Sequence, residues 1–84
     1  MRGSDEFDPW AAFDLPSAIH SQAMKLLERI KQAHTPDELW RAAERAEGFA
    51  LGIETVKALN AASQEALYIV LDNAAMARRD EYER

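Results

Sequence analysis

The sequence of 84 residues contains no cysteine, few glycines and no long hydrophobic run. The lack of cysteine excludes a disulfide framework and gives no sign of an oxidising compartment. Charged residues interrupt every apolar stretch, so no segment is long enough to cross a membrane, and no signal peptide is recognisable. We therefore expect a small cytoplasmic protein of one domain, with no membrane partner.

Positive charge is also scarce, with ten Lys and Arg against 15 Asp and Glu, which gives a net charge of −5. No segment carries the basic stripe that phosphate binding requires, and this disfavours nucleic acid as a partner. One small group of bases, Lys25, Arg29 and Lys31, leaves a nucleic-acid-associated regulator as an alternative function.

The clearest signal that is present is a helix from Thr35 to about Leu59. Thr35-Pro36-Asp37-Glu38 is a capping box with proline at the first helical position. Its two side chains are expected to accept from the amides of Glu38 and Thr35. The apolar residues that follow alternate in steps of three and four, which is typical of helices packed in bundles. They are Leu39, Ala42, Ala46, Phe49, Ile53 and Val56.

Gly48 and Gly52 interrupt this helix pattern one turn apart. Glycine lowers helix stability by about 1 kcal/mol relative to alanine. Two interpretations are open: a neighbouring backbone approaches closely along this strip, or the strip is a local weak point or slight kink of the helix.

Two further helices are predicted near residues 17–33 and 61–83. Asn60 is the expected hinge and cap between the last two helices, and one unbroken helix through Asn60 is the alternative. Residues 78–84 are expected to be a solvated charged terminus. The predicted fold class is all-α, a three-helix up-down-up bundle and potentially a helical dimer. The predicted core residues are Leu26, Ile30, Leu39, Phe49, Ile53, Val56, Leu67 and Val70.

Residues 1–16 are expected to form a flexible N-terminal segment ahead of a helical domain at 17–84. The first four residues resemble an expression-vector leader. Asp8-Pro9-Trp10 resembles short linear motifs that bind endocytic adaptor appendages. The preferred interpretation is that Trp10 and Phe13 either fold back onto the helices or are vector-derived and disordered.

No residue pattern supports catalysis or metal binding. His20 and His34 lack the spacings to carboxylates that di-iron bundles or zinc enzymes use. We therefore expect no catalytic, cofactor-binding or metal-ligating residues, and no enzyme.

The function predicted instead is a non-enzymatic protein–protein interaction module, a regulatory or adaptor protein acting through a helical surface. The central and last helices carry more apolar surface than one short partner helix can cover, which predicts a homodimer through these two helices. A further protein partner is expected but not identified by the residues. The predicted interface residues are Trp40, Ala43, Ala50, Leu51, Tyr68, Leu71 and Ala75.

Overall fold

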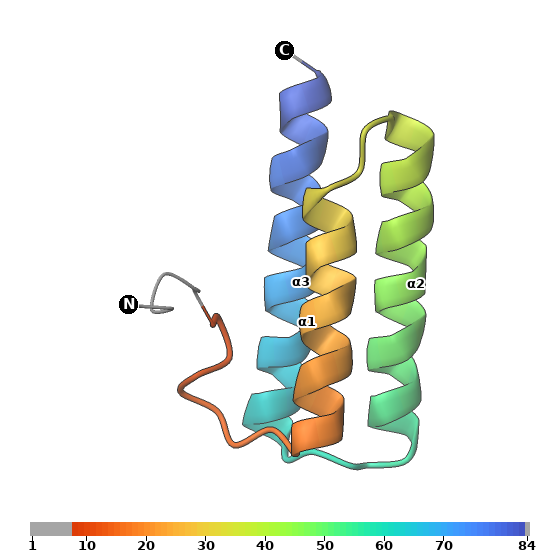
Figure 1. Ribbon diagram of the computed structural model, residues 1–84. Helices are drawn as coiled ribbons and strands as arrows, with labels where there is room; N and C mark the ends of the chain where they lie inside the picture. Colours follow the sequence, from red (N-terminus) through yellow and green to blue (C-terminus); the bar gives the residue numbers. More distant parts are fainter. Residues whose placement is uncertain (1–7, 84) are drawn as a thin grey trace.

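The computed structural model describes residues 8–83, and this part of the chain forms three α-helices and no strand. They are α1 (Ser17–Lys31), α2 (Pro36–Thr55) and α3 (Ala61–Tyr82). Each helix contacts the other two, and Figure 1 shows the two short connections at opposite ends of the molecule. The prediction of an all-α three-helix bundle is confirmed. The vector-leader interpretation concerns residues outside the described part.

Side-chain caps begin the second and third helices. The Thr35 hydroxyl accepts from the Glu38 amide at 3.1 Å, as the capping box predicts. The Glu38 carboxylate, however, accepts from the His34 amide at 2.8 Å instead of the expected Thr35 amide. Asn60 caps α3 by accepting from the Ser63 amide at 2.8 Å, so α2 and α3 are separate helices.

Helix α2 ends at Thr55, earlier than the predicted end near Leu59, and Lys57 takes a left-handed φ of 54°. The Lys57 amide donates to the Glu54 carbonyl and the Ala58 amide to the Ile53 carbonyl, which is a Schellman motif. This turn carries Val56 away from the bundle and leaves it 70% exposed. The expectation that Val56 belongs to the core is therefore wrong.

The two helical glycines face open space. A Cβ added at Gly48 or at Gly52 would meet no atom of the described chain within 4 Å, apart from its own local backbone and sequence neighbours. A close backbone approach along this strip is therefore not observed, and the interpretation that remains is a locally weaker stretch of helix.

Trp10 adds the largest fully buried side chain to the core, with 0% exposure. Its Nε1–H donates to the Ala66 carbonyl oxygen of α3 at 3.1 Å, and its ring meets His20 of α1 edge-on at 6.4 Å between centroids. Asp8 holds this arrangement, since Oδ1 accepts from the Trp10 amide and Oδ2 lies 3.0 Å from His20 Nε2. The core thus begins before residue 17, and Trp10 is not accessible as part of a linear motif. Phe13, in contrast, is exposed.

Seven of the eight predicted core residues lie in or against the core. Leu26, Ile30, Leu39 and Leu67 are buried, while Phe49, Ile53 and Val70 are half-buried and pack against them. The core also contains residues outside that prediction: Trp10, Ala23, Leu27, Ala33, Ala46, Ala50, Ala66 and Leu71. None of the three helices in the described range is both long and apolar enough to cross a membrane.

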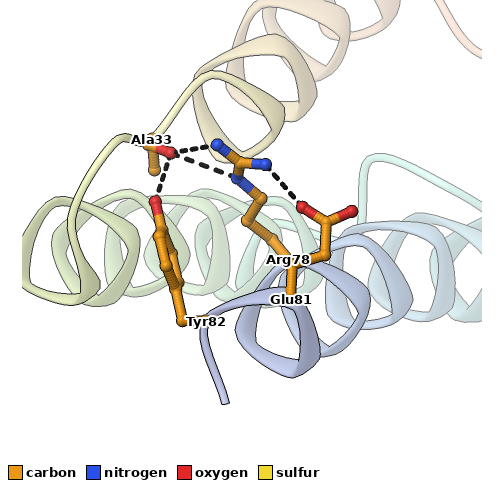
Figure 2. A network of polar contacts seen from close by, with 4 residues as sticks. All are labelled: Ala33, Arg78, Glu81 and Tyr82. Carbon is orange, nitrogen blue, oxygen red and sulfur yellow. Dashed lines mark hydrogen bonds and ion pairs between the residues drawn. The ribbon is translucent and has the colours of Figure 1, made fainter. Parts of the chain in front are cut away.

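The last turns of α3 hold the connection between α1 and α2. The Ala33 carbonyl oxygen accepts from Arg78 and from the Tyr82 hydroxyl, and Arg78 Nη1 contacts the Glu81 carboxylate at 2.5 Å (Figure 2). Part of the terminus expected to be solvated is therefore structural. Arg78 and Tyr82 are half-buried, whereas Arg79, Asp80 and Glu81 are exposed.

Candidate functional site

An open apolar depression follows the seam between α2 and α3; we call it the α2/α3 trough. It consists of two hollows, of about 310 Å³ and 300 Å³, that share the lining residues Ala43 and Ala75 and therefore adjoin. The first is lined by Ala43, Ala46, Glu47, Ala50, Tyr68, Ile69, Leu71, Asp72 and Ala75. The second is lined by Pro36, Leu39, Trp40, Ala43, Ala75, Arg79, Tyr82 and Glu83.

Small side chains make the floor of the trough. Ala43, Ala46 and Ala50 follow one face of α2 at spacings of three and four, so they stand one above the other. Ala75 lies opposite them on α3. Because an alanine side chain ends at Cβ, two helices that meet through alanines leave a depression between their larger flanking side chains.

Large apolar side chains border this floor and face solvent. Trp40 on α2 is 61% exposed and Ile69 on α3 is 48% exposed. Two more exposed apolar residues continue the edges by helical spacing, Leu51 four residues after Glu47 and Met76 seven residues after Ile69. The trough is therefore an extended apolar surface that the bundle itself leaves uncovered.

Polar contacts across the seam fix how α2 and α3 sit against each other. Gln64 is buried and donates from Nε2 to the Ala50 carbonyl oxygen at 3.0 Å. The Tyr68 hydroxyl donates to Glu54 at 2.9 Å. Partial desolvation raises the pKa of Tyr68 above its ordinary value of 10.0, and the hydrogen bond and negative charge of Glu54, with the charge of Glu47, raise it further.

Six of the seven predicted interface residues line the trough, namely Trp40, Ala43, Ala50, Tyr68, Leu71 and Ala75. The seventh, Leu51, lies exposed beside it. Ala50 and Leu71 are themselves buried in this single chain, so they can act only as floor.

Nine further lining residues are outside that interface prediction: Pro36, Leu39, Ala46, Glu47, Ile69, Asp72, Arg79, Tyr82 and Glu83. Helical spacing gives a signal for two of them, because Glu47 follows Ala43 by four residues and Asp72 follows Tyr68 by four.

The basic residues of α1 do not form one patch. Lys25 and Arg29 are four residues apart and share a face, but Lys31 lies about 200° around the helix from Arg29. The structure instead brings Arg29 close to two arginines of α2, Arg41 and Arg45, in a hollow between α1 and α2. Asp37 pairs with Arg41 at 3.2 Å along α2, and the pair is exposed.

The described residues 8–83 bring no three His, Cys, Asp or Glu side chains together in a way that could hold a metal ion. Asp8 and His20 do line an open hollow with Ser17 and Ser21. The contact between Asp8 and His20 already has a structural role, because it positions Trp10.

No family model, no curated protein and no solved structure matches this chain. The geometry of its own residues is therefore what carries a functional proposal.

Proposed function

We propose that this protein is a non-enzymatic interaction module, a regulatory or adaptor protein, that binds another protein through the α2/α3 trough. The observation that supports it is Trp40, a tryptophan 61% exposed at the edge of an apolar depression that spans two helices. Tryptophan and tyrosine are enriched among the residues that dominate protein–protein binding energy. Contiguous exposed apolar surface on a small protein is typical of an interaction site.

The floor residue Ala43 offers a direct test, because it belongs to both hollows. Arginine at this position would fill the trough with a long side chain. Proteins captured from the source cells by the immobilised wild-type chain should be lost with Ala43→Arg and with Trp40→Ser. They should be retained by Glu28→Gln, an exposed position of α1 away from the trough.

Circular dichroism establishes that each variant keeps its helices before capture is compared. Capture of the same proteins by all four chains would place the binding surface elsewhere and contradict the proposal.

Self-association is an alternative use of the same surface, because the predicted dimer interface and the trough share six residues. Sedimentation equilibrium separates the two uses. A dimer mass that falls to 9.5 kDa with Ala43→Arg would identify a second copy as the occupant.

A nucleic-acid-associated regulator is the other candidate, supported by the hollow that Arg29, Arg41 and Arg45 line. Glu38 lines the same hollow, and the Asp37 carboxylate pairs with Arg41. A binding titration at two salt concentrations tests it, since phosphate contacts weaken steeply as salt rises. Absence of salt-dependent binding, or binding unaffected by Arg45→Ala, would count against this candidate.

A further inference from the structure

Carboxylates follow both edges of the α2/α3 trough. Glu47 on α2 and Asp72 on α3 line the first hollow, and Glu83 lines the second together with Arg79. The α2 edge continues to Glu54, which lies seven residues after Glu47 and therefore on the same face. The rim is thus acidic around the first hollow, while the second hollow carries one acid and one base.

We propose, resting on the function proposed above, that the occupant of the trough is a cationic amphipathic helix of another protein. A helix that lays its apolar face into a groove between two helices is a recurring mode of peptide recognition. Large apolar side chains of such a helix fit against the alanine floor, where Ala43 and Ala75 end at Cβ. Lysine or arginine side chains along its flanks meet the carboxylates of Glu47 and Asp72.

The length of the trough sets the length of the partner helix. The α2 residues that line it extend from Pro36 to Ala50. At 1.5 Å per residue this stretch measures about 21 Å, which corresponds to about four turns, or about 14 residues, of the bound helix.

Charge argues against a second copy of the chain as the occupant. In a symmetric dimer the same patch lies on both sides of the interface. The acidic rim of one first hollow would then lie in the same interface as that of the other, and like charges across an interface disfavour association. A basic partner removes this repulsion and replaces it with attraction.

The test uses the full chain and two synthetic probes. The first is a helical peptide of about 14 residues with leucines spaced for one face and lysines on the other. The second is the same peptide with every lysine replaced by glutamate. The indole N–H signals of the two tryptophans report the site, because Trp40 borders the trough whereas Trp10 is buried and bonded to Ala66.

The lysine peptide is expected to shift the Trp40 indole signal and leave that of Trp10 in place, and the glutamate peptide is expected to shift neither. The double variant Glu47→Gln/Asp72→Asn should weaken binding of the lysine peptide by about three- to tenfold. The matched variant Asp14→Asn/Glu28→Gln removes the same charge from exposed positions outside the trough and should leave binding unchanged. Filling the floor with Ala43→Arg should abolish the Trp40 shift, and Trp40→Ser should weaken binding followed by backbone amide signals.

Three outcomes would overturn the inference. Equal weakening by both double variants would mean that the peptide senses only net charge. Equal binding of the lysine and glutamate peptides, lost with Ala43→Arg, would mean an apolar groove without charge selection, and the proposed function would survive. A wild-type dimer that Ala43→Arg dissociates would make the occupant a second copy. A different result would contradict the proposed function itself: capture of cellular proteins that is unaffected by Ala43→Arg and by Trp40→Ser.

Discussion

Arg78 on α3 donates from Nε and Nη2 to the carbonyl oxygen of Ala33, at 3.1 Å and 2.6 Å (Figure 2). Ala33 lies just past the end of α1, in the connection to α2, so one guanidinium ties the three helices together at one end of the bundle. Tyr82 donates its hydroxyl to the same oxygen, and the guanidinium lies over its ring at 5.3 Å from the centroid. The hydrogen bond to the Glu81 carboxylate is the largest of the causes that raise the pKa of Arg78, so the guanidinium stays charged.

Loss of these donors is expected to destabilise the bundle. Tyr82→Phe should lower the free energy of unfolding by about 1 kcal/mol, because a hydrogen bond to a partly buried carbonyl is lost. Arg78→Ala should lower it further, and Arg79→Ala, at an exposed neighbour, should have little effect. Urea denaturation measures all three. If Arg78→Ala and Arg79→Ala were equally mild, the Ala33 contact would not contribute to stability.

Substitution of the two tryptophans is expected to change stability by very different amounts. Trp10→Ala should destabilise the protein by about 3–5 kcal/mol, since it empties a fully buried site and removes the indole hydrogen bond to the Ala66 carbonyl. Trp40→Ala removes an exposed side chain and should change stability by less than about 0.5 kcal/mol. Thermal unfolding followed by circular dichroism makes the comparison. A small effect of Trp10→Ala would show that residues 8–16 do not belong to the folded core.

Lys57 occupies a left-handed backbone position that glycine adopts without steric cost. Lys57→Gly should therefore raise the free energy of unfolding by about 0.5–1 kcal/mol, the steric relief being partly offset by greater freedom of the unfolded chain. Ala58→Gly serves as the control, because it adds the same freedom without relief of strain, and should destabilise. Equal effects of the two substitutions would contradict the Schellman geometry.

Glycine is dispensable, in contrast, in the middle of α2. Gly48→Ala and Gly52→Ala should each raise the free energy of unfolding by about 1 kcal/mol, because the added methyl groups meet open space and alanine favours the helix. Chemical denaturation with the single and double variants tests this. Destabilisation by either alanine would contradict this and would indicate a close contact at the glycine, such as one with a second copy of the chain.

The Tyr68 hydroxyl, at the edge of the trough, is expected to make the stability of the fold depend on pH in the alkaline range. A pKa raised in the folded state means that the neutral phenol is favoured by folding. The contribution of Tyr68 to stability is complete below its pKa in the unfolded chain, near 10. That contribution is lost as the pH rises through its higher pKa in the folded protein. Glu54→Gln removes a negative charge and should lower the pKa of Tyr68. Carbon-13 NMR of the tyrosine rings measures it, and an unchanged pKa would rule out Glu54 as a cause.

Much of the trough was predictable because its residues recur at helical spacing. Trp40, Ala43 and Ala50 share one side of α2, and Tyr68 and Ala75 one side of α3. Helical spacing does not predict the charge of its rim. Glu47 and Asp72 belong to separate helices, and only the docking of α2 against α3 places them on opposite edges of one depression.

The local structure of this protein follows from short stretches of its sequence. Proline at the first turn, the Thr35 and Asn60 caps and the apolar spacing act within a few residues of chain, so they specify where helices begin and which face is apolar. Three features became evident only from the packing of the helices: Trp10 completes the core, Val56 turns outward, and the Ala33 carbonyl accepts from Arg78. The first and last of these contacts join residues 56 and 45 positions apart. Which distant side chain fills a gap depends on how the helices are rotated against one another, and no local spacing encodes that rotation.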